Sequence, residues 1–191
     1  MDLNTFFNAE FDEHEAVTRA TREAVLDDFI RLCRVAQDAL QGGNKLIFFG
    51  NGGSAADAQH LAAELVVRYK VNRAPLAAIA LTTDSSTLTA GANDFGYETI
   101  FDRQLRALGR AGDVAVGIST SGRSPNVIRA LRAAGDIGVV PTALSGGDGG
   151  DLTGLADPLL IVPSKTIARI QEMHITLGQM LCDVLEQTCA R

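Results

Sequence analysis

Short apolar runs alternate with helical patterns along most of this 191-residue chain. Each run ends in a turn of small residues, and the stretch that follows carries apolar residues at intervals of three and four, which is typical of a helix. The runs cover 45–49, 76–81, 113–118, 139–144 and 159–162, and the helical patterns cover 54–69, 85–92, 97–108, 125–134 and 166–188. Strands that alternate with helices form a parallel sheet covered on both faces, so we expect an α/β doubly wound fold.

A helical pattern precedes the first strand. Apolar residues from Asn4 to Leu40 recur at intervals of three and four, which predicts one broken helix or two consecutive helices, ended by Gly42 and Gly43. We therefore expect a single domain over residues 1–191, divided into an N-terminal helical extension, 1–41, and an α/β core, 42–191.

The composition excludes several kinds of partner. The 17 Lys and Arg against 23 Asp and Glu give a net charge of −6, and no basic run offers a surface to nucleic acid or to an anionic membrane. The N-terminal stretch is acidic, no basic leader is present, and no window of about 18 apolar residues occurs. We expect a soluble, cytosolic protein. Cys33, Cys182 and Cys189 have no C-x-x-C spacing, which predicts buried or idle thiols instead of a disulfide framework or a zinc finger.

Two loops of unusual composition follow the first and third strands. The glycine loop, Gly-Asn-Gly-Gly-Ser, occupies residues 50–54, and the hydroxyl loop, Ser-Thr-Ser-Gly-Arg-Ser, occupies residues 119–124. In a sheet of the order 2-1-3-4-5 the winding reverses between strands 1 and 3, and ligands bind beyond the carboxyl ends of the strands at that point. We expect the two loops to face each other across one crevice.

The hydroxyl loop favours a phosphate ligand. A strand that leads small hydroxyl residues to a helix N-terminus brings together side-chain donors, free backbone N–H groups and the positive end of the helix dipole. The alternative is an ordinary helix N-cap, with Ser124 as the cap and Pro125 at the first helical position. That alternative accounts for only one of the four hydroxyl side chains, so we prefer the phosphate interpretation.

The glycine loop also fits the dinucleotide pattern G-x-G-x-x-A through Ala55, which keeps an NAD-linked function open. The acidic residue that should follow about 20 positions later is absent, because Asp84 comes too late. A tight strand-to-helix turn that needs glycine dihedral angles is the simpler alternative. We therefore disfavour NAD as the ligand.

His60 and Glu64 are four residues apart on the helix that follows the glycine loop, so their side chains lie on one face, one turn apart. Apolar neighbours such as Ala62 and Leu65 argue against the alternative of a solvated surface pair, because an imidazole and a carboxylate in apolar surroundings need each other or a ligand. The pair is therefore a candidate for chemistry.

The other two histidines are candidates for structural positions. His174 lies on the mostly apolar closing helix, and at 100° per residue it diverges from Gln179 by about 140°, so the two cannot face the same ligand. We expect His174 to be a hydrogen-bonded core or interface residue. His14, in the acidic N-terminal stretch, is expected to be solvated.

Several motifs, in order along the chain, resemble one known family. They are Gly50–His60 (GNGGSAADAQH), Glu64, Asn93–Gly96 (NDFG), Ile118–Gly122 (ISTSG) with Ser124, and Ala168–His174 (ARIQEMH). This set closely resembles the sedoheptulose-7-phosphate isomerases, or phosphoheptose isomerases, of the sugar-isomerase (SIS) fold. The resemblance covers nearly the whole chain, so it is far more specific than any single motif.

The resemblance implies a fold, an activity and an assembly. The fold is a single SIS domain with a five-stranded parallel sheet in the flavodoxin-like order 2-1-3-4-5, flanked by helices, with N-terminal oligomerisation helices and a long C-terminal helix. The activity is the aldose–ketose isomerisation of sedoheptulose 7-phosphate to D-glycero-D-manno-heptose 7-phosphate, the first step toward the ADP- or GDP-activated heptose of bacterial surface polysaccharides such as lipopolysaccharide. The assembly is a cytosolic homotetramer with active sites between subunits.

The resemblance also implies roles for particular residues. The sugar phosphate would be held by Ser119, Thr120, Ser121 and Ser124. The sugar would be lined by Asn51, Gly52, Gly53, Ser54, Glu64, Asn93, Asp94 and Gln171. Glu64 would be the base that moves a proton between C1 and C2 through an enediol, with residue 179 as its partner.

The resemblance further implies one zinc ion per subunit, held by His60, Glu64, Gln171 and residue 179. Here the chain departs from the family, because residue 179 is Gln where the catalytic isomerases have His. Gln has no proton to titrate near pH 7, and it is a poorer zinc ligand than imidazole. We expect turnover to be slower by about 10²–10⁴-fold, with weakened zinc binding and with phosphate binding largely retained.

Two other kinds of function are compatible with these residues. The missing His at position 179 fits a non-catalytic SIS protein that binds the bacterial replication initiator, although that relative also lacks the carboxylate present here at Glu64. A phosphosugar sensor, or an isomerase for another chain length, would show the same loops, because pocket depth is not visible in a sequence. The isomerase of seven-carbon sugar phosphates is our leading hypothesis.

Overall fold

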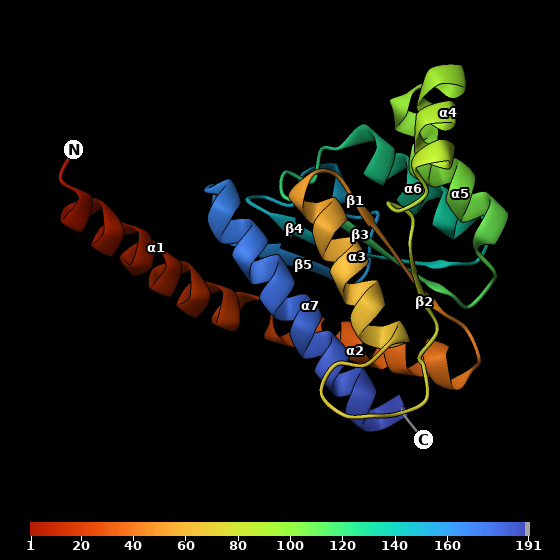
Figure 1. Cartoon of the computed structure of the whole chain (residues 1–191), viewed down its shortest axis with the longest axis horizontal. Helices are drawn as coiled ribbons and strands as arrows, with labels where there is room; N and C mark the ends of the chain where they lie inside the picture. Colours follow the sequence, from red (N-terminus) through yellow and green to blue (C-terminus); the bar gives the residue numbers. More distant parts are fainter. Residues whose placement is uncertain (190–191) are drawn as a thin grey trace.

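The computed structural model of the protein describes residues 1–189, and Figure 1 shows its helices and strands. The helices are α1 (Leu3–Ala24), α2 (Leu26–Gln41), α3 (Gly53–Val66), α4 (Ser85–Phe95), α5 (Ile100–Leu108), α6 (Pro125–Asp136) and α7 (Ile167–Cys189), with the 3₁₀ turns η1 (Tyr97–Thr99) and η2 (Gly150–Leu152). The strands are β1 (Leu46–Gly50), β2 (Ala78–Ala80), β3 (Val114–Ser119), β4 (Val140–Gly146) and β5 (Leu159–Val162). Strands and helices largely alternate from β1 onward, as the sequence predicts.

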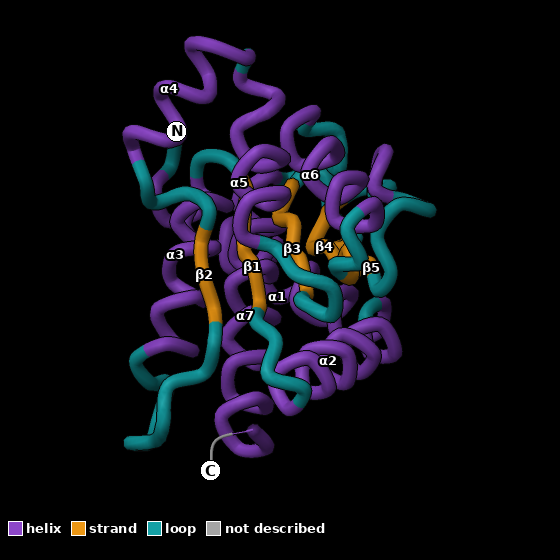
Figure 2. Tube along the Cα trace, turned by 90° about the vertical axis from the view of Figure 1, so that its right-hand side faces the viewer, coloured by secondary structure: helices purple, strands orange, loops and turns teal. Residues whose placement is uncertain are grey.

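The five strands form one parallel sheet in the order β2-β1-β3-β4-β5 (Figure 2). This order confirms the predicted doubly wound topology. The chain passes from β1 to β2 on one side and then crosses back to β3 on the other side of β1. Gly50 lies opposite Ile118 in the register, so the carboxyl ends of β1 and β3 lie side by side. The glycine loop and the hydroxyl loop therefore start next to each other.

Alternate residues of the strands point to opposite faces of the sheet. Leu46 and Phe48 of β1 pack in a core with side chains of α2, α3 and α7. Ile47 and Phe49 pack in a second core with side chains of α5 and α6. All four side chains are fully buried. A strand that is buried on both faces reads as a continuous apolar run, which explains the pattern at 46–49.

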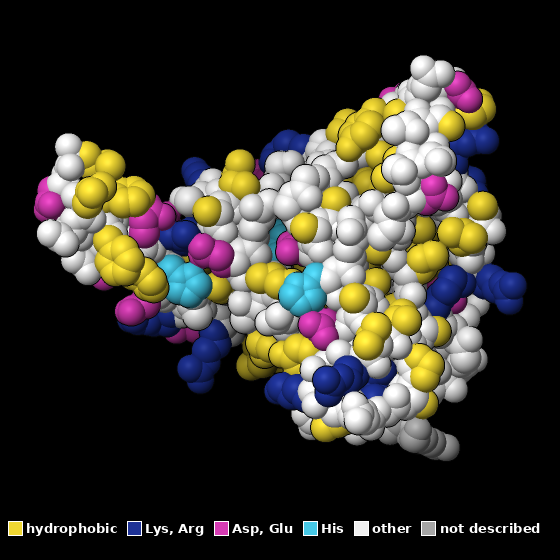
Figure 3. All heavy atoms as spheres, in the orientation of Figure 1, with side chains coloured by type: hydrophobic (Ala, Val, Ile, Leu, Met, Phe, Trp, Pro, Cys, Tyr) yellow, Lys and Arg dark blue, Asp and Glu magenta, His cyan; other side chains and the backbone are white. Residues whose placement is uncertain are grey.

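The N-terminal segment forms two helices with different surroundings, separated at the buried Val25. α2 contributes Leu32 and other side chains to the core, whereas α1 projects from the body of the molecule (Figure 1). Apolar side chains gather on this projecting segment (Figure 3), among them the exposed Leu3, Phe6, Phe7 and Phe11. Within residues 1–189, no helix has the length and apolar character needed to cross a bilayer. The exposed apolar surface of α1 suits packing against another protein surface.

Some details of the secondary structure differ from the sequence-based expectation. β2 covers only Ala78–Ala80 instead of the predicted 76–81; it is one of the two edge strands and pairs with β1 alone. The helical pattern at 97–108 divides into η1 and α5, and η2 follows β4 where the sequence predicts a loop. α4 buries none of its residues, and it stands away from the sheet in Figure 1.

The three cysteines are free thiols, and two of them, Cys33 and Cys182, are buried. Burial raises the pKa of the Cys182 thiol to about 12 and the pKa of the Cys33 thiol to about 11. Neither thiol is ionised near pH 7, so neither is a nucleophile there. The expectation of buried, idle thiols is confirmed at these two positions.

Candidate active site

The hydroxyl loop, residues 119–124, leads from the end of β3 to the N-terminus of α6. Ser124 is the N-cap residue of α6, but its side chain makes no capping hydrogen bond. Instead, Oγ of Ser124 lies 3.0 Å from Oγ of Ser119, and the Ser121 hydroxyl accepts a hydrogen bond from the backbone N–H of Arg123 at 3.1 Å. The Ser124 hydroxyl is therefore not consumed by the helix cap, and the positive end of the α6 dipole is available to an anion.

The loop that follows β4 packs directly on the hydroxyl loop. Gly122 has a φ of 65°, and a Cβ at this residue would lie 2.0 Å from the carbonyl oxygen of Gly149. The backbone N–H of Asp151 donates to the Gly122 carbonyl at 3.0 Å. Only glycine fits at position 122, because φ is positive and the neighbouring backbone leaves no space. This contact supports the hydroxyl loop without using its hydroxyl groups.

The glycine loop, residues 50–54, makes a tight turn between β1 and α3. Gly52 has a φ of 56° and precedes the first residue of α3. A Cβ at Gly53 would lie 2.5 Å from Nε2 of Gln171 on α7, so the absence of a side chain lets α7 approach this turn. The glycines thus serve the strand-to-helix turn, and the turn places Gln171 beside it.

The two loops are joined by a pair of side-chain amides. Nδ2 of Asn51 donates to Oδ1 of Asn126 at 2.9 Å, and Nδ2 of Asn126 donates to Oδ1 of Asn51 at 2.8 Å. Asn126 is the second residue of α6 and is buried. The hydroxyl of Tyr97, in η1, also donates to Oδ1 of Asn51 at 3.1 Å. The glycine loop and the start of α6 therefore lie side by side.

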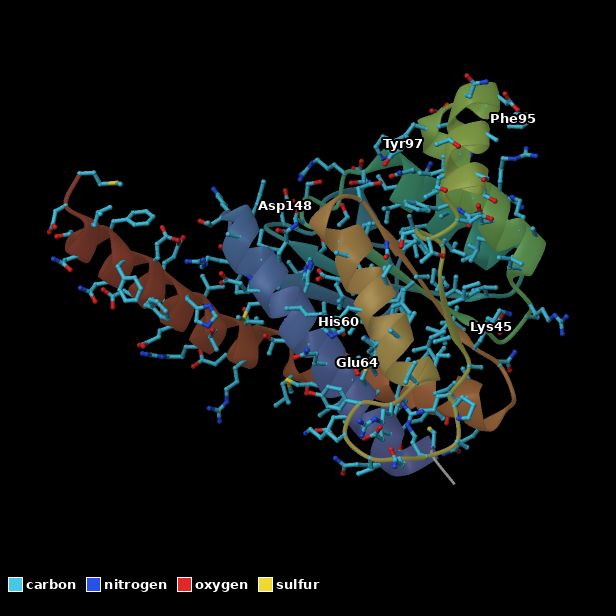
Figure 4. All side chains as sticks on the ribbon, in the orientation of Figure 1. Lys45, His60, Glu64, Phe95, Tyr97 and Asp148 are labelled. Atoms are coloured by element: carbon cyan, nitrogen blue, oxygen red, sulfur yellow. The ribbon has the colours of Figure 1, made fainter. Side chains whose placement is uncertain are left out.

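His60 and Glu64 are in contact on α3, as their spacing predicts. Nε2 of His60 lies 2.9 Å from Oε1 of Glu64. The His60 side chain is 46% exposed and the Glu64 side chain is 22% exposed, so the pair is neither buried nor fully solvated. Figure 4 shows both residues beside α7. The pair is accessible to a ligand and holds two groups that can exchange protons.

α3 and α7 run parallel, so residues of the two helices can be compared by their position along the helix axes. The candidate residues lie at two such positions, which we call levels. Gln171 lies against Gly53 near the start of both helices, and Gly178 lies against Leu61 two turns further along. Gln179 is therefore level with the pair of His60 and Glu64, whereas Gln171 is level with the glycine loop. Eight residues of helix, about 12 Å, separate Gln171 from Gln179.

We name these two levels the loop group and the helix group. The loop group consists of residues 50–54, residues 119–124 and Gln171, and the helix group consists of His60, Glu64 and Gln179. Eleven residues of α3, about 16 Å along the helix axis, separate Gly53 from Glu64. One chain thus carries a part with hydroxyl groups beside a helix N-terminus and a part with titratable side chains, separated by about 16 Å along α3.

Asn93 and Asp94, which the resemblance implies as sugar ligands, lie near the end of α4. Both are exposed, and Nδ2 of Asn93 donates to Oδ1 of Asp94 at 2.8 Å. Among residues 1–189, neither side chain hydrogen-bonds to the loop group. The segment is connected to the glycine loop by Tyr97, a few residues further along the chain.

The other histidines and Asp84 have structural positions. His174 is fully buried, its Nε2 donates to the carbonyl of Ser145 at 2.9 Å, and burial lowers its pKa to about 4. It is the core histidine that the sequence predicts. The His14 side chain is 40% exposed, so it is in part solvated as predicted, but its Nδ1 also lies 2.8 Å from Oε2 of Glu172 where α1 meets α7, a contact that the sequence did not predict. The Asp84 carboxylate caps α4, which explains this acid without a dinucleotide.

Sequence reasoning missed three polar residues near the site. Asn126 and Tyr97 contact Asn51, and the usable signal for Asn126 was its place in the first turn of the helix that the hydroxyl loop opens.

Asp57 is the third of these residues, and it lies three residues before His60 on α3. Within the described residues its Oδ2 is buried without a hydrogen-bond partner, and burial raises the pKa of this carboxyl. The spacing of three residues to His60 could have pointed to it.

The four residues implied as zinc ligands do not come together in one chain. His60 and Glu64 offer an imidazole and a carboxylate, which suit zinc. Gln171 and Gln179 cannot both join them, because about 12 Å of helix separates these two residues. In the part of the chain that the structure describes, no group of three or more His, Cys, Asp or Glu could hold a metal ion. The residues of one chain thus do not fit a complete zinc site, and no step below depends on a metal.

Comparisons with known proteins agree with one another. The SIS domain family model matches residues 11–146. The chain is 60% identical to the phosphoheptose isomerase of Paramagnetospirillum magneticum over 190 residues, which are 100% of this chain and 99% of the relative. The structure of the phosphoheptose isomerase of Neisseria gonorrhoeae matches with a TM-score of 0.92 and 42% identity, over 97% of this chain and 100% of that chain. The structure of a phosphoheptose isomerase from Francisella tularensis matches with a TM-score of 0.94 and 35% identity, over 98% of this chain and 100% of that chain.

The three relatives bear on the choice between an enzyme and a non-catalytic protein. Each is named as an isomerase, so they do not support the alternative of an SIS protein that binds a replication initiator. Gln179 is the residue that motivates the non-catalytic alternative, and Glu64 is the residue that argues against it; the Glu64 carboxylate lies 2.9 Å from His60.

Proposed function

We propose that this chain, because it belongs to the phosphoheptose isomerase family of SIS-domain proteins, interconverts sedoheptulose 7-phosphate and D-glycero-D-manno-heptose 7-phosphate. It is an aldose–ketose isomerase of phosphorylated sugars. The observation that carries the proposal is the junction of the glycine loop with the start of α6, where Asn51 and Asn126 exchange hydrogen bonds. At such a junction a phosphate and the adjoining part of the sugar can be bound together.

The hydroxyl loop would hold the phosphate. Its hydroxyl side chains are those of Ser119, Thr120, Ser121 and Ser124. The N-terminus of α6 adds a positive dipole end to these donors. Because the chain as a whole has a net charge of −6, the attraction for the anion has to be local. The sugar would be lined by Asn51, Gly52, Gly53, Ser54, Asn93, Asp94 and Gln171.

The isomerisation moves one hydrogen between neighbouring carbons. A base removes a proton from C1 of the ketose to form the C1–C2 enediol and then returns a proton to C2, while a proton passes from the oxygen on C1 to the oxygen on C2. We assign the carbon base to Glu64, whose Oε1 lies 2.9 Å from the His60 imidazole. Residue 179 would handle the protons on the oxygens. Because Gln179 has no titratable proton near pH 7, this chain is expected to turn over slowly.

The separation of the two groups favours an active site built from two copies of the chain. About 16 Å of α3 lies between Gly53 and Glu64, whereas an extended heptose 7-phosphate is shorter, since its six C–C bonds span roughly 8 Å and the C–O–P link adds about 2.5 Å. A sugar phosphate held by the loop group of one copy would therefore meet the helix group of another copy.

Surfaces suited to such an assembly lie on α1 and beside it. α1 exposes Phe6, Phe7 and Phe11. A groove of about 370 Å³ lies between α1, α2 and α7, and its mostly apolar lining includes Phe29 and Met180. Exposed apolar surfaces of this kind favour contact between protein chains. They support the homotetramer with shared active sites that the family resemblance implies.

The direct test of this function is turnover by the purified protein. We expect D-glycero-D-manno-heptose 7-phosphate to form slowly from sedoheptulose 7-phosphate, and faster than the corresponding aldoses form from five- and six-carbon ketose phosphates. Product formation is followed by chromatography coupled to mass spectrometry. Turnover of only the shorter substrates would contradict the assigned chain length. A protein that neither binds nor converts any of these sugar phosphates would contradict the proposed function.

A shared active site predicts complementation between two inactive proteins. Glu64→Gln removes the carbon base, and the double substitution Ser119→Ala, Ser124→Ala removes the contacting hydroxyl pair of the hydroxyl loop. If copies mix at random, about a quarter of the sites combine an intact loop group with an intact helix group. We therefore expect about a quarter of the parental activity after the two proteins are unfolded and refolded together.

The control for this experiment is a protein that carries all three substitutions. It cannot supply either group, so mixing it with either inactive protein should restore nothing. The formation of mixed oligomers is verified by native mass spectrometry. Mixed oligomers without any recovered activity would show that both groups of one site belong to the same chain.

A further inference from the structure

The side-chain amide of Asn51 is the point where three segments of the chain meet. Its Oδ1 accepts hydrogen bonds from Nδ2 of Asn126 at 2.8 Å and from the Tyr97 hydroxyl at 3.1 Å. Its Nδ2 donates to Oδ1 of Asn126 at 2.9 Å. A primary amide has two lone pairs on oxygen and two N–H donors, so both lone pairs and one N–H are used. The second N–H of Asn51 has no hydrogen-bond partner among residues 1–189.

The orientation of the two amides is determined by a backbone group of α6. Oδ1 of Asn126 accepts a hydrogen bond from the backbone N–H of Val127 at 3.0 Å, in addition to the bond from Asn51. A backbone N–H can only donate, so the oxygen of Asn126 must face the N–H of Val127, and the nitrogen of Asn126 then faces the oxygen of Asn51. Asn51 in turn must direct its oxygen to the nitrogen of Asn126. The first turn of α6 thus decides which way the Asn51 amide points.

The burial of Asn126 separates its role from that of Asn51. Asn126 is 2% exposed, so a ligand cannot reach it and any effect on binding has to act through a neighbour. Tyr97 is 59% exposed and belongs to η1, just after Asn93 and Asp94; Figure 4 shows it beside α4. The buried pair therefore couples the glycine loop to α6, and Tyr97 couples the end of the α4 segment to the same amide.

We propose that Asn126 and Tyr97 are positioning residues, which orient the amide of Asn51 so that its remaining N–H donates to an oxygen of the sugar phosphate. This inference rests on the proposed function, because it requires a ligand at the junction of the two loops. The two hydrogen bonds between Asn126 and Asn51 also hold the glycine loop at a fixed distance from the start of α6, where the hydroxyl loop ends. The spacing between the two ends of the ligand site is then set before the ligand binds.

Calorimetric titration with sedoheptulose 7-phosphate tests the proposal in a Glu64→Gln background, in which the ligand is not consumed. Loss of hydrogen bonds of this kind is expected to weaken binding about tenfold in Asn51→Ala and Asn126→Ala, and about threefold in Tyr97→Phe. Once Asn51 has been replaced by Ala, adding Asn126→Ala or Tyr97→Phe should change the affinity by less than about twofold. A residue that acts through Asn51 has nothing left to position in that background.

Asn44 offers a matched control beside the amino end of β1, the end opposite the glycine loop. Its amide donates to the Ala111 carbonyl at 3.0 Å, so Asn44→Ala also removes a side-chain amide contact between segments but lies far from the ligand site. We expect it to lower the melting temperature and leave the affinity unchanged.

The possible results separate the inference from the function on which it rests. Weakening by Asn126→Ala that is the same with and without Asn51 would show a general structural role and overturn the proposal. If Asn126→Ala does not fold, the exposed Tyr97→Phe decides, and a loss that persists without Asn51, or no loss at all, overturns the proposal. If neither the unsubstituted protein nor the Glu64→Gln parent binds the sugar phosphate, the proposed function is refuted, and the inference with it.

Discussion

Replacing Glu64 by Gln is expected to lower kcat for the isomerisation of sedoheptulose 7-phosphate by about 10²–10⁴-fold, the range typical for loss of a general base. Gln has nearly the same shape as Glu, but it has no carboxylate to accept a carbon-bound proton. The affinity should change little, because the proposed function assigns the phosphate to the loop group and not to this side chain. Initial rates give kcat and KM, and calorimetry gives the dissociation constant.

Exchange of hydrogen with solvent gives this variant a second readout. The parent protein in D₂O should introduce deuterium at C1 of unreacted ketose through the enediol, and Glu64→Gln should lose this exchange together with kcat. Glu172→Gln is a matched control, since Oε2 of Glu172 also contacts a histidine, Nδ1 of His14, at 2.8 Å. It belongs to neither group, so kcat should stay within about twofold. Turnover by Glu64→Gln above about a tenth of the parental rate would contradict the assignment of the base.

Gln179→His is expected to raise kcat by about 10²–10⁴-fold over the parent protein, with little change in affinity for the sugar phosphate. An imidazole titrates near neutral pH, so it can pass a proton between the two oxygens of the enediol, which Gln cannot do. Residue 179 is level with His60 and Glu64 on the neighbouring helix, so the new imidazole would join the helix group. The pH profile of kcat should acquire a limb near pH 6.5 that the parent lacks.

Gln187→His is the matched control for this gain of activity. It makes the same replacement on the same helix, two turns further along, at an exposed Gln whose Nε2 donates to Oδ1 of Asp183 at 2.9 Å. The control protein should keep the parental kcat. An equal gain in both variants would point to a nonspecific effect, and no gain in Gln179→His would remove residue 179 from the proton-transfer step.

The topology of the sheet could be predicted because it depends on local patterns. The strand at 46–49 is apolar at every position, and such a strand requires helices on both faces. Five runs of this kind that alternate with helices leave few possible arrangements. The same reasoning located the glycine loop and the hydroxyl loop at neighbouring strand ends, where β1 and β3 pair in the structure.

Contacts within one helix could also be predicted. The pair of His60 and Glu64 is four residues apart, and the helical period alone brings their side chains together. The length of a helix likewise shows that Gln171 and Gln179 lie about 12 Å apart. The surroundings of His14 could not be obtained in this way, because its partner Glu172 is more than 150 positions away in the sequence.

The sequence by itself determined the order of the elements and the spacing of residues inside each one, because both follow from the fixed periods of helices and strands. The tertiary structure alone decided how one element is placed along another. The contact of Gly53 with Gln171 and that of Leu61 with Gly178 set α3 parallel to α7 and divide the candidate residues into two levels. Such placement depends on side-chain packing between segments far apart in the chain, and no local period encodes it.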